Sequence, residues 1–185
     1  MTQKVIIYHA LRQPHVVARL RDELDAADLS YPVPYKQTWQ LAYLDAIVQE
    51  ALRIHPPISG LLERAVPEPG LLLPDGRATP PGTIVGMNQW VITRNKEVFG
   101  HDAEDFCPER WLVENDKCET DYRVRLRRMK DVAGFAFGGG NRACIGKRLP
   151  RAELYKTTAT LFGKYNVRRT DCPRCCRSGP NHAYR

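Results

Sequence analysis

One cysteine stands among residues that could give it a chemical role. Cys144 lies near the end of the glycine-rich stretch FGGGNRACIG, residues 137–146. Three successive glycines carry no Cβ, so the backbone can bend sharply there and approach a flat partner closely. Arg142 lies two residues before the sulfur, and a helical pattern begins directly after it. A cation and free helix N–H groups both favour the thiolate, which is the form that binds metals. The stretch therefore predicts an anionic sulfur presented to a planar, electrophilic group.

Two simpler interpretations of this stretch compete with that one. A single cysteine beside glycines, taken without its other neighbours, is more often a small core residue than a ligand. The glycine run could also hold a phosphate group, but residues 138–142 (GGGNR) lack the Gly-Lys-Ser/Thr ending of a P-loop. The order of all ten residues favours metal ligation over both.

The spacing F-x-x-G-x-R-x-C-x-G resembles the haem-binding loop of the cytochrome P450 superfamily, whose members ligate haem through a cysteine thiolate. The resemblance implies that Cys144 is the axial ligand of haem b, which is iron protoporphyrin IX. It also implies that Phe137 packs near the porphyrin, while Gly146 keeps the far side of the sulfur bare. Arg142 and Arg64 would pair with haem propionates, although Arg64 fits a plain surface charge equally well.

Two other segments resemble superfamily motifs in the expected order. Glu50 and Arg53, followed by HPP at 55–57, are similar to its E-x-x-R helix, and PERW at 108–111 is similar to its P-E-R-[FW] segment. The resemblance implies that Glu50, Arg53 and Arg110 form one buried charge network that fixes the loop carrying the sulfur, because an orphaned buried charge is costly. From helical spacing alone, Glu50 and Arg53 fit an exposed ion pair worth roughly a few tenths of a kcal/mol.

Apolar periodicity predicts a mainly α fold with a small β-sheet region, which the resemblance identifies as the incomplete, C-terminal part of the cytochrome P450 fold. Prolines and glycines between short apolar runs predict a small β-hairpin region within residues 58–95. The resemblance implies that PPGT at 80–83 and WVITR at 90–94 belong to the small sheet of the superfamily. Pro150 is expected to kink its helix, because a helix begun near Ile145 places it just past the first turn. The helices are expected over residues 1–12, from Pro14 onward, over 39–55 with Thr38 as the cap, and over 147–164.

The chain has 185 residues, enough for one domain with a hydrophobic core. The resemblance implies that a full-length member is more than twice this size. We expect residues 1–167 to be the C-terminal portion of a cytochrome P450 domain and residues 168–185 to form an irregular Cys/Arg/Pro-rich tail. The oxygen-side threonine motif of the superfamily is not found, and residues 1–12 are expected to begin just after it. No residue on the oxygen side of the haem is therefore assigned a catalytic role.

The formal net charge is +7, and one basic cluster runs from Lys117 to Lys130. A solvated loop is the simplest interpretation of this cluster, and nucleic-acid binding is not expected. The resemblance implies a third interpretation. Superfamily members take electrons from an acidic reductase through a basic proximal surface, and this cluster immediately precedes the cysteine loop.

The six cysteines are irregularly spaced, which argues against a disulfide framework. Cys172, Cys175 and Cys176 contain one C-x-x-C pair and no second pair, so they give only a weak indication of zinc. No run of residues approaches the ~18 apolar residues of a membrane-spanning helix, and the first residues do not form a signal peptide. For a full-length member, the resemblance implies the endoplasmic-reticulum membrane.

The function implied by the resemblance is that of a haem-thiolate monooxygenase. Such an enzyme inserts one oxygen atom of O2 into a small organic substrate, using NADPH-derived electrons that a reductase delivers. Residues 58–95 are most similar to fungal members of the pisatin demethylase type. The alternative is a truncated, non-catalytic fragment that binds haem weakly or not at all, and the isolated chain is expected not to turn over substrate.

Overall fold

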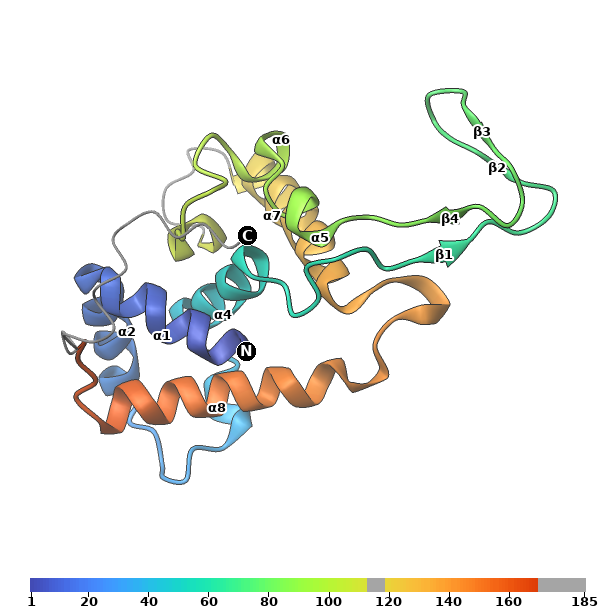
Figure 1. The fold of residues 1–185 in the computed structure, drawn as a ribbon. Coiled ribbons are helices and arrows are strands. Elements are labelled where there is room, and N and C mark those ends of the chain that lie inside the picture. The colour runs from blue at the N-terminus through green and yellow to red at the C-terminus, as the bar shows by residue number, and fades with distance from the viewer. Residues whose placement is uncertain (113–118, 170–185) are drawn as a thin grey trace, which may run out of the picture.

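Helix α4 (Ala42–Ile54) lies at the centre of the fold, and other helices surround it (Figure 1). The computed structural model describes residues 1–112 and 119–169. Every α4 residue from Tyr43 to Ile54 is buried except Asp45, which is half-buried. A helix that is buried on all sides belongs to the interior of a domain. The other elements are therefore placed by their contacts with α4.

The described residues are mainly helical with a small β region, as predicted. The other α-helices are α1 (Thr2–Arg12), α2 (Pro14–Ala26), α3 (Tyr35–Thr38), α5 (Gln89–Ile92), α6 (Lys96–Phe99), α7 (Glu119–Gly134) and α8 (Arg148–Lys164). Short 3-10 helices cover Pro108–Trp111, Phe135–Phe137, Gly140–Arg142 and Ile145–Lys147. The strands are β1 (Arg64–Ala65), β2 (Leu71–Leu72), β3 (Ala78–Thr79) and β4 (Ile84–Val85), with β1 antiparallel to β4 and β2 antiparallel to β3.

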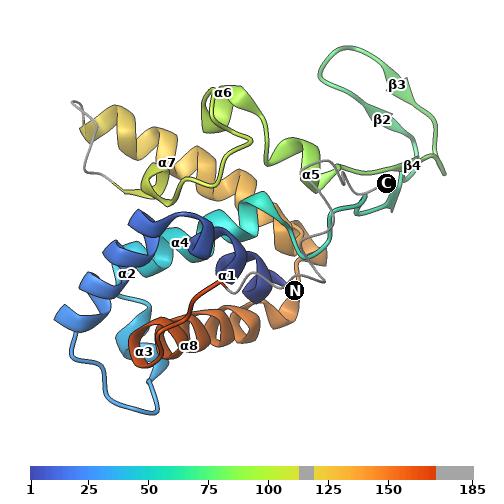
Figure 2. The ribbon, with the colours of Figure 1, turned by 60° about the vertical axis from the view of Figure 1, so that its left-hand side comes forward.

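Two hydrophobic clusters meet at α4. On one side α1, α2 and α8 pack against it, as Figures 1 and 2 show, and contribute side chains such as Ile6, Leu20 and Phe162. The second cluster joins Ala46 of α4 to residues that include Met129 of α7, together with Phe99 and Trp111. The predicted helices over residues 1–12 and from Pro14 onward are confirmed as α1 and α2.

The prediction that Thr38 caps the central helix is wrong. Thr38 ends the short helix α3, and its hydroxyl donates to the Tyr35 carbonyl at 2.9 Å. The start of α4 is capped from another helix instead. The Glu23 carboxylate of α2 accepts hydrogen bonds from the backbone N–H groups of Tyr43 (2.8 Å) and Leu44 (2.9 Å). A carboxylate at this position satisfies free N–H groups and complements the helix dipole.

The Glu23→Ala substitution should lower the free energy of unfolding by about 1–2 kcal/mol, the cost of losing a strong N-cap. Urea denaturation followed by circular dichroism measures this change. Asp25→Ala is the matched control, because Asp25 is exposed on the same helix. An equal loss in both variants would contradict the capping role of Glu23.

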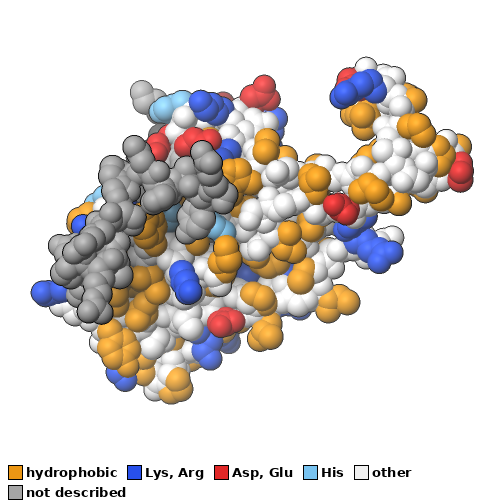
Figure 3. Space-filling view, viewed as in Figure 1, with side chains coloured by type: hydrophobic (Ala, Val, Ile, Leu, Met, Phe, Trp, Pro, Cys, Tyr) orange, Lys and Arg blue, Asp and Glu red, His pale blue; other side chains and the backbone are white. Residues whose placement is uncertain are grey.

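The β region projects from the helical part of the chain (Figure 1). Hairpins were predicted within residues 58–95, and both strand pairs lie there. Figure 3 shows hydrophobic side chains exposed along this projection, where Leu72 is 71% exposed. The prediction of strand for residues 90–94 is wrong, because α5 begins at Gln89. The Asn88 side chain accepts from the Trp90 N–H at 3.0 Å and so caps that helix.

Two expectations for the segments flanking the cysteine loop are also corrected. Helix α8 begins at Arg148 and not near Ile145, so Pro150 lies in the first turn, where its missing N–H costs no helical hydrogen bond. The basic cluster is not a solvated loop over its described part, since α7 begins at Glu119. Tyr122, Met129 and Ala133 are buried at helical spacing on one face of α7, while its arginines point to solvent.

Within residues 1–112 and 119–169, we find no helix with the length and apolar character required to cross a bilayer.

Candidate functional site

A buried charge network holds α4 to the segment that follows α6. Glu50 and Arg53 are both 0% exposed, so the interpretation as an exposed ion pair is wrong. Arg53 binds Glu50 through two hydrogen bonds of 2.7 and 2.8 Å, the strong bidentate geometry of a guanidinium and a carboxylate. The same carboxylate accepts from Arg110 Nε (3.0 Å), the Cys107 N–H (2.8 Å) and Trp111 Nε1 (2.9 Å). The three charged residues thus meet at one carboxylate.

The remaining donors of the two arginines are also satisfied. Arg53 donates to the carbonyls of Thr93, Ala103 and Asp105 at 2.6–2.9 Å. Arg110 donates to the Phe99 carbonyl at 2.6 Å and to the Asp102 side chain at 3.1 Å.

The pairing of Asp102 with Arg110 shifts the pKa of each group. Burial acts against both charges, but the hydrogen bond and charge of Arg110 hold the pKa of Asp102 below its ordinary value. Glu50 and Asp102 likewise hold the pKa of Arg110 above its ordinary value despite burial. Asp102 and Arg110 therefore both stay charged at neutral pH, and each charge is paired, as partly or fully buried charges require.

The glycine loop has a backbone path that glycines make possible. Gly138 and Gly140 have φ of +72° and +58°, in the left-handed region that other residues rarely adopt. A Cβ at Gly139 would lie 2.9 Å from the Phe135 ring. The Cys144 N–H donates to the Phe137 carbonyl at 2.8 Å and closes the loop. The three glycines predicted to allow a sharp bend do so here.

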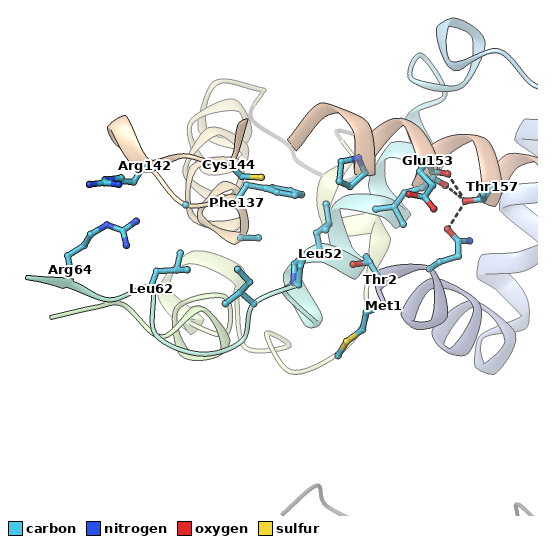
Figure 4. Close-up of a pocket in the computed structure, with 17 residues that line it drawn as sticks. Met1, Thr2, Leu52, Leu62, Arg64, Phe137, Arg142, Cys144, Glu153 and Thr157 are labelled. Carbon is cyan, nitrogen blue, oxygen red and sulfur yellow. Dashed lines mark hydrogen bonds between the residues drawn. The ribbon is translucent and has the colours of Figure 1, made fainter. Parts of the chain in front are cut away.

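Cys144 has an exposed, free thiol on the wall of a cavity of about 480 Å³. Figure 4 shows Cys144 and Phe137 on one wall, with Leu62 and Leu52 opposite them. A Cβ added at Gly146 would meet Cys144 Sγ at 3.9 Å and no other atom beyond its chain neighbours, so the glycine leaves the sulfur uncovered on its side. The interpretation of Cys144 as a packed core residue is therefore wrong.

Two arginines lie together at one end of this cavity. Arg64 comes from β1 and Arg142 from the glycine loop, and both line the cavity (Figure 4). Cys144 Sγ accepts no capping hydrogen bond at the start of the 3-10 helix Ile145–Lys147. The cavity thus combines a bare sulfur, largely apolar walls and two cations at one edge.

Part of the cavity wall could not be predicted from local sequence. Met1 and Thr2, at the start of α1, lie opposite Glu153 and Thr157 of α8 (Figure 4). The Thr157 hydroxyl donates to the Gln3 side chain at 2.8 Å and holds the two helices together there. These residues are about 155 positions apart, so no spacing within the sequence could reveal their contact.

The described residues contain no group of three or more His, Cys, Asp or Glu side chains arranged to hold a metal ion. The residues of the cavity nevertheless fit a metal held by a macrocycle. An iron porphyrin needs one axial ligand from the protein, an apolar slot for its rings and cations beside its carboxylates. Cys144, Phe137, and the pair Arg64 and Arg142 supply these features. Cys172, Cys175 and Cys176 lie outside the described residues.

Comparison with known proteins identifies relatives of one family. The family model described as Cytochrome P450 matches residues 1–178. A cytochrome P450 monooxygenase of Aspergillus terreus is 42% identical over 180 residues, which cover 95% of this chain and 35% of that protein. A pisatin demethylase of Fusarium vanettenii is 35% identical over 162 residues, covering 88% of this chain and 29% of that protein.

These relatives are about three times longer than the region they share with this chain, so the chain spans about a third of their length. The expected similarity to fungal members, including the pisatin demethylase type, is confirmed. The match of the family model to most of the sequence establishes membership. This chain belongs to the cytochrome P450 family.

Proposed function

We propose that this chain carries the thiolate side of the haem site of a cytochrome P450 monooxygenase, with Cys144 as the axial ligand of haem b. One observation supports this proposal above the others. The exposed Cys144 thiol lies on the wall of an apolar cavity that has Arg64 and Arg142 at one end. Bound haem would supply activation of O2 and insertion of one oxygen atom into an organic substrate, with NADPH-derived electrons delivered by a reductase.

Each residue at the cavity has a separate role in this proposal. Cys144 would donate electron density from its thiolate, and the Cys144 N–H bond to the Phe137 carbonyl holds the sulfur in place. Phe137 would pack against the apolar rings, and the Arg151 guanidinium lies over its own ring, 5.8 Å from the ring centre. Arg64 and Arg142 would orient the macrocycle by pairing with its carboxylates.

Titration of the chain with hemin, followed by absorbance, tests this site. Saturable binding of one equivalent is expected, with weaker binding when Arg64 and Arg142 are both replaced by Gln. Unsaturable binding that is indifferent to these substitutions would contradict the proposal.

A second candidate is a non-catalytic chain that binds haem weakly or not at all. It applies to these residues taken alone, because the relatives have about two thirds of their length outside the region that they share with this chain. The substrate in the first candidate is a small organic molecule. The hemin titration separates the two candidates, because only the first predicts saturable binding of one equivalent. Product formation with a reductase and NADPH is a separate test, and none is expected from the isolated chain.

We propose that the exposed basic face of α7 binds the acidic reductase, in a full-length protein at the endoplasmic-reticulum membrane. Arg127 and Arg128 lie on this face, and α7 leads directly into the cysteine loop. The double substitution Arg127→Glu and Arg128→Glu should slow association with the reductase roughly tenfold or more at low salt, because steering depends on opposite charges. Stopped-flow association measures this rate.

The matched control for this prediction is Lys4→Glu with Lys156→Glu, which changes the net charge equally on α1 and α8. Equal slowing by both pairs would mean that overall charge, and not the α7 face, controls association.

A further inference from the structure

The cysteine loop is held to the helical part of the chain at its two ends. Ala136 is buried just before the loop, and no residue from 137 to 153 is buried. Leu154 and Tyr155 of α8, the helix that leaves the loop (Figure 1), are the first buried residues after the sulfur. Both belong to the hydrophobic cluster that contains α4. The position of Cys144 therefore depends on how α8 is anchored at Leu154 and Tyr155.

Tyr155 joins α8 to α4 by a hydrogen bond to a charged group. Its hydroxyl donates to Asp45 Oδ1, which also accepts from Gln49 Nε2 at 3.3 Å. Tyr155 is 4% exposed, and its ring meets the Tyr35 ring of α3 edge to face, with the ring centres 5.8 Å apart. Burial and the Asp45 charge raise the pKa of Tyr155, so its hydroxyl stays neutral and remains the donor. Such a bond is stronger than one between neutral groups, and it fixes a direction as well as a distance.

Arg151 connects this anchor to the loop. It lies one helical turn before Tyr155, where residues four apart are neighbours, and its charge partly offsets the rise in the pKa of Tyr155. The Arg151 guanidinium lies over the Phe137 ring, 5.8 Å from the ring centre. The Phe137 carbonyl in turn accepts from the Cys144 N–H at 2.8 Å. A continuous series of contacts thus runs from Asp45 on α4 to the backbone of Cys144.

The buried charge network does not bond to the loop itself. Within residues 1–112 and 119–169, the hydrogen bonds of the Glu50, Arg53 and Arg110 side chains run within α4 and to residues 93–111. The network fixes α4, and Asp45 lies on the same helix. The bond from Tyr155 to Asp45 therefore gives the network a connection to α8 and, through α8, to the loop.

We infer that Tyr155 and Arg151 are positioning residues for the cysteine loop. Tyr155 fixes α8 on α4, and Arg151 fixes the Phe137 ring on α8, so the carbonyl that holds the Cys144 N–H keeps its place. Neither residue is among those that line the Cys144 cavity. Their consequence for haem binding rests on the proposed function of Cys144, whereas their effect on the position of the loop does not.

Hydrogen exchange of the complete 185-residue chain without haem tests this inference. The Cys144 amide reports on the loop, because its bond to the Phe137 carbonyl closes the loop. In Tyr155→Phe, which removes only the hydroxyl, this amide should exchange about tenfold faster relative to amides in the second half of α4, a change of about 1.4 kcal/mol. Arg151→Met keeps an apolar stem but removes the charge over the Phe137 ring, and it should accelerate exchange about threefold.

Tyr43→Phe is the matched control. Tyr43 is 3% exposed, and its hydroxyl donates to the Glu109 carboxylate at 2.6 Å, so the substitution removes a bond of the same kind from α4. A merely structural role of Tyr155 predicts that both variants lose stability and that Cys144 exchange rises equally in the two. The inference predicts that Tyr43→Phe leaves Cys144 exchange unchanged relative to α4.

Cys144 exchange that is unchanged in either Tyr155→Phe or Arg151→Met would overturn the inference, and so would equal acceleration in Tyr43→Phe. Hemin titration of the unmodified chain is a separate measurement. Faster loop exchange in the two variants, together with no saturable hemin binding by the unmodified chain, would overturn the proposed function alone.

Discussion

Glu50→Gln is expected to lower the free energy of unfolding by about 3–5 kcal/mol, because it removes the anion that both buried arginines share. Arg53 is completely buried and Arg110 nearly so, hence neither can recover its lost partner from solvent. The amide N–H groups of the new glutamine would also face the N–H groups of the arginines, so hydrogen-bond donors would meet without an acceptor. Small domains have total stabilities of about 5–15 kcal/mol, so this one substitution should remove a large part of the total.

Urea denaturation monitored by circular dichroism measures this loss. Asp75→Asn is the matched control, since Asp75 pairs with Arg77 at an exposed site and its loss should not be measurable. If the two substitutions gave equal effects, the buried network would not be a main source of stability.

Cys144→Ser is expected to abolish thiolate ligation of haem completely. A serine hydroxyl has nearly the same size, but it does not ionise near neutral pH and so cannot supply the anionic ligand. Apolar contacts around the cavity would persist, so some haem could still associate without the thiolate spectrum. Absorbance and magnetic circular dichroism of the hemin-loaded chain report the ligand directly.

Cys107→Ser is the control for this second substitution. Cys107 is half-buried, and burial raises the pKa of its thiol, so it is poorly suited to act as a thiolate. It is also not among the residues that line the Cys144 cavity. The Cys107 variant should keep the spectrum, and a spectrum lost in both variants would mean that the effect is not specific to Cys144.

Features that depend on residues close in sequence could be predicted well. The sharp bend of the glycine loop and the helices α1 and α2 follow from local preferences of glycine, proline and apolar spacing. The meeting of Glu50 with Arg110 spans sixty residues, and only the motif resemblance indicated it. From spacing alone, Glu50 and Arg53 fitted an exposed pair, because helical periodicity does not reveal a helix that is buried on all sides.

Features that depend on contacts between residues far apart in the sequence could not be predicted, because local patterns do not show which elements meet. Glu23 caps α4 from another helix, so the local capping signal at Thr38 was misleading. The buried face of α7 was obscured by the arginines between its apolar residues. The role of Gln3 has no local signature at all, since a glutamine gains such a role only when folding brings it beside partners far along the chain, here Thr157 and Thr158.

The reduced carbon-monoxide difference spectrum of the hemin-loaded chain tests the central claim most directly. That claim is that the Cys144 sulfur ligates haem iron as a thiolate. We predict a strongly red-shifted Soret band that Cys144→Ser eliminates. A band at the position given by a neutral or nitrogen ligand, or one unchanged in Cys144→Ser, would contradict the account.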